Sequence, residues 1–307
     1  MILGLHHITA IAGSPKANYD FYTGIMGLRL VKKTVNFDDP NTYHFYFGNE
    51  QGSPGTILTF FPWAHVKPGR IGTGQATEIG YSVPAGSLDF WEEWLKKNKV
   101  RVGIREERFG EILLPFRDPD GLFISLVVPG KIDNRPAWTT DAVNVDVATR
   151  GFHGVTLLLK DIRPTVAILT EVFGYRLLGN EGNCYRYITD AVENASIVDL
   201  LDDPEGQMGV VAGGTNHHVA FRVKDEEELM SYRDKILERG LSITSKIDRN
   251  YFFSLYFREP GGILFEIATE NPGFAVDEAP AELGKGLKLP SQYESMREAI
   301  VKRLPAI

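Results

Sequence analysis

An internal duplication constrains the fold of this chain more than any other feature of its sequence. Near the ends of the two halves, RDPDGLFISLV (117–127) and REPGGILFEIA (258–268) share the pattern R-x-P-x-G followed by an apolar strand. Earlier in each half, IMGLRLV (25–31) matches VFGYRLL (172–178). Repeated segments of this kind indicate one structural unit used more than once. We therefore expect two similar halves.

Each half reads twice as a strand, a helix and several further strands, which predicts four βαβββ units of the α+β class. Helices are expected near residues 15–26, 87–98, 163–173 and 226–239. The division that follows is an N-terminal domain at 1–131, a polar linker at 132–150, a C-terminal domain at 151–270 and a tail at 271–307. In the tail, Ser291 and Glu294 form a capping box ahead of apolar residues at helical spacing. We expect a packed helix there that lies across the second domain.

The overall charge and the cysteine count limit the classes of function. The formal net charge is -7, which opposes nucleic-acid binding because phosphate backbones need clustered Lys and Arg. No apolar run reaches the roughly 18 residues of a membrane span, and the N-terminus lacks the pattern of a signal peptide. We therefore expect a cytoplasmic protein without membrane contacts. Because Cys184 is the only cysteine, a metal would be held by histidine and carboxylate.

Two pairs of adjacent histidines open strands in the first and fourth units: His6 and His7 in LHHITAI, His217 and His218 in NHHVAFRV. Neighbouring strand residues point to opposite faces, so one histidine of each pair should face the core and the other a cleft. His217 shares its face with three apolar residues. His218 is therefore the cleft residue of the second pair.

The repeat helps to decide which histidine of the first pair faces the cleft. Counted back from the repeated glycine, His153 in the third unit corresponds to His6 and not to His7. The polarity of Thr9, which shares a face with His7, favours His7 as the cleft residue. His153 shares its face with three apolar residues, so it is expected to be a packed core histidine.

Glu266 is a carboxylate in the middle of an apolar strand. In ILFEIA the alternation puts Phe265 and Ile267 on the packed face and Glu266 in the cleft. A buried carboxylate is costly unless it is paired or binds a metal; an exposed sheet face is the alternative. Two histidines and one carboxylate match the facial triad of non-haem Fe(II) oxygenases, which leaves coordination positions open for substrate and O₂.

Two further residues could contact a substrate. Tyr256 shares a face with Ser254 and Arg258 on the strand before Glu266. It could hydrogen-bond a phenolate, or it could be a core tyrosine with a satisfied hydroxyl. Arg249, in the preceding turn, could supply positive charge to an anionic substrate, and a solvated turn arginine is the alternative.

The histidine pairs of the first and fourth units, with Glu266 closing the fourth, resemble the vicinal oxygen chelate superfamily. Within it the chain is similar to the hydroquinone-type ring-cleaving dioxygenases, including the bacillary proteins of methylhydroquinone resistance. The segments that carry this likeness are LHHIT, YHFYFGNEQGSPGT, RGFHG, NHHVAF, PGGILFE and LGKGLKLPSQYE. The resemblance covers essentially the whole chain. It implies two glyoxalase-like domains and cleavage of a hydroquinone or catechol ring, in the detoxification or degradation of aromatics.

The resemblance also implies roles residue by residue. His7, His218 and Glu266 would bind Fe(II), and Zn, Ni or Mn could occupy the site in purified protein. The residues that would act around the metal are His6, Thr9, His217, Arg249 and Tyr256. The partners would be a small aromatic substrate and O₂, and a homo-oligomer is compatible with the sequence.

Two rival functions remain open on the same fold. A glyoxalase-like lyase or isomerase would use Zn²⁺ or Ni²⁺ as a Lewis acid. Such sites usually carry a fourth protein ligand, whereas the position that matches Glu266 in the second unit is Ser125. A metal-free protein that binds a toxic aromatic is the other rival, and it would not need the three ligand residues. The sequence favours the oxygenase.

Overall fold

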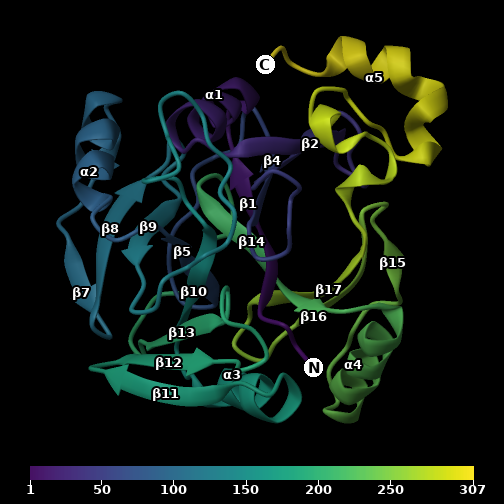
Figure 1. Cartoon of the computed structure of the whole chain (residues 1–307). Helices are drawn as coiled ribbons and strands as arrows, with labels where there is room; N and C mark the ends of the chain where they lie inside the picture. Colours follow the sequence, from purple (N-terminus) through teal and green to yellow (C-terminus); the bar gives the residue numbers. More distant parts are fainter.

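The computed structural model describes residues 1–307 and contains two mixed sheets, each built from both halves of the sequence (Figure 1). The first sheet joins the first and fourth units. Its strands are β1 (Leu5–Ala12), β2 (Arg29–Val35), β3 (Tyr43–Gly48), β4 (Ile57–Pro62), β14 (Thr215–Val223), β15 (Ile247–Asp248), β16 (Phe252–Arg258) and β17 (Leu264–Pro272). They lie in the order β15-β16-β17-β14-β1-β4-β3-β2. The antiparallel pair β1 and β14 therefore joins the two units at the centre.

The second sheet joins the second and third units. Its strands are β5 (Gln75–Ser82), β6 (Arg101–Val102), β7 (Glu106–Arg108), β8 (Glu111–Arg117), β9 (Phe123–Val128), β10 (Gly151–Leu159), β11 (Arg176–Glu181), β12 (Cys184–Ile188) and β13 (Ile197–Asp202). The order is β11-β12-β13-β10-β5-β9-β8-β6, and β7 pairs with β8. Both sheets thus cross the boundary between the sequence halves, so residues at opposite ends of the chain lie side by side.

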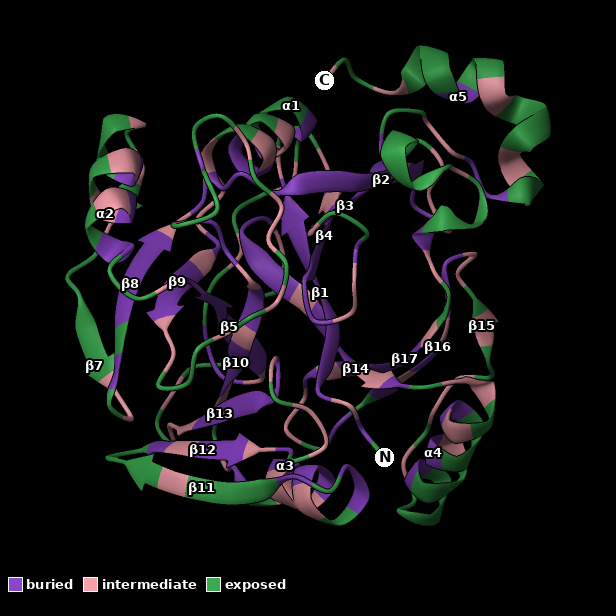
Figure 2. Ribbon diagram, viewed as in Figure 1, coloured by how far each residue is buried: buried purple, intermediate pink, exposed green.

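Each unit carries one helix near the periphery of the molecule, with exposed residues turned outward (Figure 2). The helices are α1 (Pro15–Asp20), α2 (Leu88–Lys97), α3 (Arg163–Ala167) and α4 (Glu226–Glu238). The first and third continue as a π-helical turn, at 21–25 and 168–172. Gly27 and Gly174 follow these turns with φ of 66° and 79°. Glycine adopts this left-handed conformation without strain, which explains the repeated glycine after both helices.

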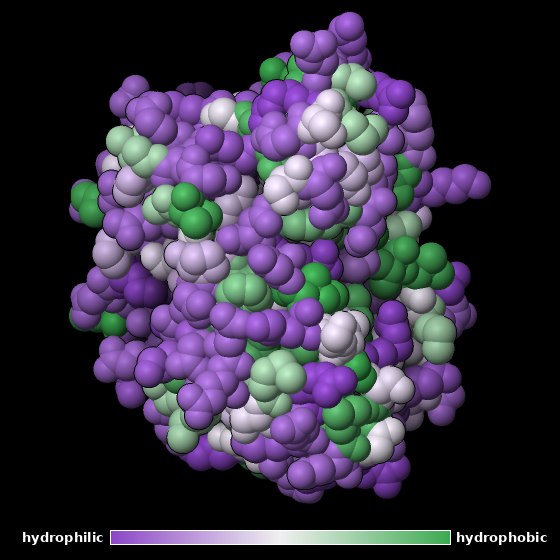
Figure 3. All heavy atoms as spheres, turned by 90° about the vertical axis from the view of Figure 1, so that its right-hand side faces the viewer, coloured by the Kyte–Doolittle hydropathy of each residue, from purple (hydrophilic) through white to green (hydrophobic).

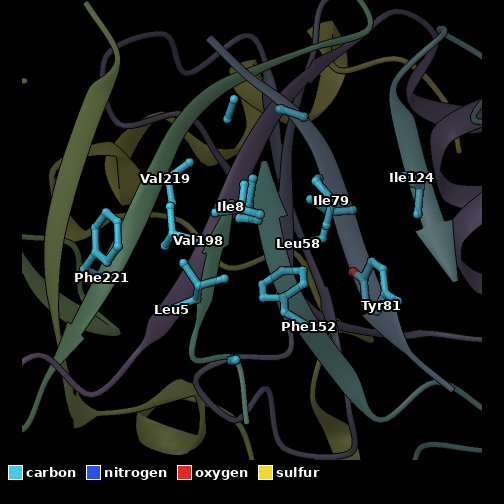
Figure 4. Close-up of a cluster of buried hydrophobic side chains, with 14 of the residues drawn as sticks. Leu5, Ile8, Leu58, Ile79, Tyr81, Ile124, Phe152, Val198, Val219 and Phe221 are labelled. Carbon is cyan, nitrogen blue, oxygen red and sulfur yellow. The ribbon is translucent and has the colours of Figure 1, made fainter. Parts of the chain in front are cut away.

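One apolar core connects the two sheets. A single cluster of 54 buried residues contains Ile8 and Val219 from the first sheet and Ile79 and Phe152 from the second (Figure 4). These four residues come from the central strands β1, β14, β5 and β10. The predicted α+β class and the four βαβββ units are confirmed. No helix is both long and apolar enough to cross a membrane.

The repeated R-x-P-x-G segment is a turn that fixes the start of the following strand. In the second half, Arg258 donates to the carbonyl of Gly262 at 2.6 Å, and the buried Glu259 accepts from the backbone N–H of Ile263 at 2.8 Å. The equivalent residues of the first half make the same two contacts. The turn therefore sets the register of β17, which carries Glu266.

The prediction for the tail was wrong in two respects. Ser291 makes no capping hydrogen bond; a 3₁₀ turn at 291–296 precedes a short helix α5 (Arg297–Arg303), and Glu294 pairs with Arg297 instead. The helix also packs on the first unit and not across the second domain, since Ile300 lies in a cluster with Val35 of β2. The helical spacing identified an apolar face, but it carries no information about which surface covers that face.

Candidate metal centre

His7, His218 and Glu266 come together on three neighbouring strands of the first sheet. Ala220 of β14 pairs with His7 of β1 on one side and with Glu266 of β17 on the other. His218 lies two residues before Ala220, so all three side chains project from the same face. Each is nearly inaccessible, with exposed fractions of 2%, 5% and 0%. The fold therefore brings together the three residues that strand alternation placed in the cleft.

Three donor atoms of these residues converge on one point. The Oε2 atom of Glu266 lies 3.1 Å from His7 Nε2 and 2.9 Å from His218 Nε2, and the two nitrogens are 3.3 Å apart. Three donors held about 2.1 Å from one ion, at right angles, lie about 3.0 Å apart. Glu266 Oε2 is buried and has no hydrogen-bond partner, while Ser254 donates to Oε1. The donor set fits one divalent cation.

Burial favours the neutral form of two of the buried imidazoles, and the neighbouring histidines keep the carboxylate ionised. Desolvation lowers the pKa of His218 and lowers the pKa of His6 well below its usual value. Burial by itself raises the pKa of Glu266, but His7 and His218 outweigh this effect and hold that pKa well below its ordinary range. Metal ligands must be neutral imidazoles and ionised carboxylates. His218 and Glu266 are therefore held in the protonation states that bind a cation.

The preceding histidine supports each candidate histidine ligand. His6 Nδ1 lies 2.8 Å from His7 Nδ1, and His217 Nδ1 lies 2.8 Å from His218 Nδ1. Each contact occupies the nitrogen that points away from Glu266, and such a contact orients a metal-binding imidazole. The strand register is irregular beside His7.

His217 also lines the cavity, although its place on an apolar strand face had suggested the core.

A cavity of about 260 Å³ opens beside the three donors. Its wall is largely aromatic, with Phe37, Phe61, Trp63, Phe252 and Tyr256, and it also contains Thr9, His44, Tyr46, His217 and Arg249. Figure 3 shows the face of the molecule between the tail and α4, where hydrophobic side chains gather near the middle of a largely hydrophilic surface. The cavity suits an apolar ring with polar substituents.

Arg249 and Tyr256 lie together in the cavity wall. The Nε of Arg249 donates to the Tyr256 hydroxyl at 3.3 Å, and the guanidinium lies 5.2 Å from the Tyr256 ring. Arg249 forms no salt bridge with any carboxylate of the chain. Burial raises the pKa of Tyr256 far above its usual value, with Glu266 adding to the effect. The neutral Tyr256 hydroxyl and the unpaired guanidinium are therefore both available to a ligand oxygen.

The sequence reasoning missed a polar chain on β3 and β4. The hydroxyl of Tyr46 is 2.9 Å from His44 Nδ1, His44 Nε2 is 2.9 Å from the Thr59 hydroxyl, and that hydroxyl is 2.9 Å from the Thr9 hydroxyl. His44 and Tyr46 are two residues apart in YHFYFG and face the same side. The alternation of polar and apolar residues in this segment could have indicated that His44 and Tyr46 face the cavity. It was overlooked because both polar residues are themselves aromatic.

The corresponding place in the second sheet cannot hold the same centre. In the second sheet Gly80 takes the place of Ala220. Its strand partners are Gly154, at the position of His7, and Ser125, at the position of Glu266. Glu78, two residues before Gly80, takes the place of His218. Glu78 accepts hydrogen bonds from Ser125 at 2.5 Å and from Arg108 at 3.0 Å. An arginine inside the fold thus neutralises the one remaining carboxylate.

His153 belongs to this second sheet and is not a packed apolar residue. It is partly buried, and its Nε2 lies 2.9 Å from Glu111 Oε2, a carboxylate that Arg186 also contacts at 2.6 Å. The prediction of an apolar environment was wrong because it considered only the neighbours on β10. Charged residues from β8 and β12 complete the surroundings of His153. His153 remains distant from the three converging donors, which belong to the other sheet.

Residues 4–126 and 151–267 match the Glyoxalase/Bleomycin resistance protein/Dioxygenase superfamily. The chain belongs to this superfamily. It is 47% identical over 302 residues to MhqO of Bacillus subtilis (strain 168), which is named as a candidate ring-cleaving dioxygenase, and the match covers 98% of this chain and 96% of the relative. It is 35% identical over 309 residues to the chlorohydroquinone/hydroquinone 1,2-dioxygenase of Sphingobium indicum, covering 98% and 95%. The family recognised from the sequence is confirmed.

Solved structures agree with the fold. A crystal structure of a candidate dioxygenase from Bacillus subtilis superposes with a TM-score of 0.96 at 46% identity, covering 100% of this chain and 97% of that one. Glyoxalase I from Zea mays gives a TM-score of 0.65 at 14% identity, covering 87% and 92%. The second likeness shows the shared glyoxalase-like architecture alone, so the chemistry has to be argued from the site.

Proposed function

We propose that this protein is a non-haem Fe(II) dioxygenase that cleaves a hydroquinone or catechol-type ring with O₂. The observation that supports this most is the convergence of three donors, His7 Nε2, His218 Nε2 and Glu266 Oε2, beside a largely aromatic cavity that His7 and His218 line. Three protein ligands on one side of an ion leave the other side free for both substrate and O₂. The names of the relatives are consistent with this reaction.

In this proposal the ion is held by His7, His218 and Glu266, with His6 and His217 orienting the two imidazoles. When bound, Fe(II) would lower the pKa of a ring hydroxyl and pass electrons from the ring to O₂, so that the ring is oxidised and the ion is again Fe(II) at the end of the reaction. Zn²⁺ could fill the same donors without supplying that redox chemistry. The metal identity is therefore part of the proposal, and Zn, Ni or Mn could occupy the site in purified protein.

The residues of the cavity would bind and orient the ring. Phe252, 5.0 Å from the His7 ring between centroids, packs beside the donors and excludes water from them. Tyr256 would donate a hydrogen bond to a ring oxygen, and the unpaired Arg249 guanidinium would stabilise negative charge on the ring as its hydroxyl ionises. The Thr9 hydroxyl, which also lines the cavity, would form a hydrogen bond with the ligand. A volume near 260 Å³ suits one ring, since pockets that bind larger, drug-sized ligands have volumes of about 300–1,000 Å³.

A glyoxalase-like reaction is the second candidate on this fold. It would require the ion to act only as a Lewis acid, and glyoxalase-like sites usually carry a fourth protein ligand. Here the cluster of candidate ligands contains three residues. An aromatic wall around an unpaired arginine also suits a phenolate better than a peptide-like thiol adduct. We therefore favour the oxygenase.

The test uses anaerobically Fe(II)-loaded protein and an oxygen electrode. Methylhydroquinone, hydroquinone and catechol should each be offered, with phenol as a control that lacks the second hydroxyl. The proposal predicts O₂ uptake with at least one diol and a ring-opened, visibly absorbing product. Turnover of the glutathione adduct of a ketoaldehyde, with no O₂ uptake from any diol, would support the glyoxalase reaction instead.

A further inference from the structure

The loop at residues 36–42, between β2 and β3, forms one wall of the cavity. Asn36, Phe37 and Asp38 all line it. The guanidinium of Arg249 lies 5.4 Å from the centre of the Phe37 ring and 5.2 Å from the centre of the Tyr256 ring. Phe37, from the first unit, therefore meets Arg249 of the fourth unit, and Arg249 in turn contacts Tyr256.

The tail holds this loop from the outside. The hydroxyl of Tyr293 donates to the carbonyl oxygen of Phe37 at 2.7 Å, and the side chain of Gln292 reaches the same oxygen at 3.4 Å. Arg303 donates to the side-chain oxygen of Asn41 at 3.3 Å. A hydrogen bond to the Phe37 carbonyl fixes the peptide plane beside its Cα, and so constrains where the ring points.

The tail is itself firmly attached to the first unit. The fully buried Lys32 forms ion pairs with Asp277 and Glu278. Further along, Leu289 and Ile300 pack against Val35, the residue that precedes the loop. The tail lies beyond residue 267, where the superfamily match ends. It is thus an addition to the shared fold that reaches the wall of the cavity.

We propose that Tyr293 is a positioning residue that fixes Phe37, and that Phe37 selects one-ring diols with small substituents such as methyl or chloro. The specificity part rests on the proposed function. With its carbonyl held, Phe37 keeps its ring against Arg249 and limits the width of the cavity on that side. Aromatic contacts depend on ring orientation, so a loop that moves would lose both the favourable contact with a ring and the exclusion of bulkier rings.

The test is a double-mutant cycle of Tyr293→Phe and Phe37→Leu, with Tyr43→Phe as the matched control. The Tyr43 hydroxyl also bonds a tail carbonyl, that of Pro305 at 3.1 Å, but does not contact Phe37. Dissociation constants for methylhydroquinone and tert-butylhydroquinone are measured anaerobically on Zn²⁺-loaded protein, through tryptophan fluorescence, since Trp63 lines the cavity. Amide hydrogen exchange of residues 36–42 is recorded in parallel, without ligand.

Tyr293→Phe should weaken methylhydroquinone binding about five-fold, the worth of one net hydrogen bond, reduce the preference over the tert-butyl compound and speed exchange in the loop. Tyr43→Phe should change neither affinity nor loop exchange. In the Phe37→Leu background, Tyr293→Phe should have no further effect on binding, because the two residues act as a unit.

Additive effects of the two substitutions, or unchanged loop exchange in Tyr293→Phe, would overturn the proposal. Failure of the wild type to bind any diol would instead count against the proposed function. In that case loop exchange still decides whether Tyr293 holds the loop.

Discussion

Replacing Glu266 by Gln should remove the metal and leave the fold intact. The substitution conserves volume in a site that is 0% exposed, and the amide oxygen can still accept from Ser254, which donates to Glu266 Oε1. What is lost is the one negative charge among the three converging donors. The metal-free proteins should therefore have similar free energies of unfolding, within about 1 kcal/mol, while the metal affinities differ widely.

The expected size follows from the role of the residue. Loss of a residue that merely supports a ligand weakens metal binding by about 10–100-fold, so loss of a charged ligand should cost at least about 100-fold. At saturating metal this removes about 2.7 kcal/mol of metal-dependent stabilisation. For a chain of 307 residues, the metal-induced rise in melting temperature should shrink by roughly 4 °C.

The assay compares thermal unfolding with metal and with chelator. Glu259→Gln is a matched control, because Glu259 is also buried but accepts from Thr165 and the neighbouring backbone, far from the two histidines. It should lower stability in both conditions and retain the metal shift. A Glu266→Gln protein that keeps the full metal-induced shift would show that Glu266 is not a metal ligand. One that unfolds without metal as readily as a core deletion would show that Glu266 stabilises the fold itself.

Three further predictions concern other parts of the molecule. His7→Ala should lose metal with little loss of stability, whereas His153→Ala, which breaks the contact with Glu111, should keep metal and cost about 1–3 kcal/mol; metal analysis and urea unfolding of both variants check this. Burial, helped by Asp120, raises the pKa of Asp118 to about 7. Because this pKa is higher in the folded than in the unfolded protein, the protonated Asp118 stabilises the fold. The contribution to the free energy of unfolding is fully present below the pKa of an unfolded aspartate, and up to about 4 kcal/mol of it is lost as the pH rises through 7. Asp118→Asn should remove this component, so wild-type and variant unfolding curves at pH 4 and pH 8 should show it, and parallel pH dependence would exclude it. Lys32→Met should leave Asp277 and Glu278 without their buried partner and cost about 3 kcal/mol in urea unfolding, with unchanged metal content; an unaffected midpoint would show that the tail is held by other contacts.

Much of the site was predictable from strand periodicity. In ILFEIA the period of two put Glu266 opposite the apolar residues, and the repeat count separated His7 from His6 by comparison with His153. These arguments need only local geometry, because a strand fixes the face of every residue it contains. The four units and their helices were predictable for the same reason, since each has its own pattern of apolar residues.

Contacts between distant segments were not predictable in this way. The alternation in YHFYFG could not show that His44 would meet Thr59, nor could the pattern on β10 reveal that Glu111 and Arg186 surround His153. The tail was placed on the wrong surface for the same reason. The apolar face of a helix predicts that another surface covers it. Only the assembled sheets determine which surface that is.

The stoichiometry of O₂ in the reaction with methylhydroquinone tests most directly whether this protein is a ring-cleaving dioxygenase. Fe(II)-loaded protein would be mixed with the diol under ¹⁸O₂, with O₂ uptake, ring loss and product mass recorded together. A ring-cleaving dioxygenase should consume one O₂ per ring and place both labelled atoms in a ring-opened product, and Glu266→Gln should be inactive. Formation of the quinone with peroxide, or no O₂ uptake by the metal-loaded wild type, would contradict this function.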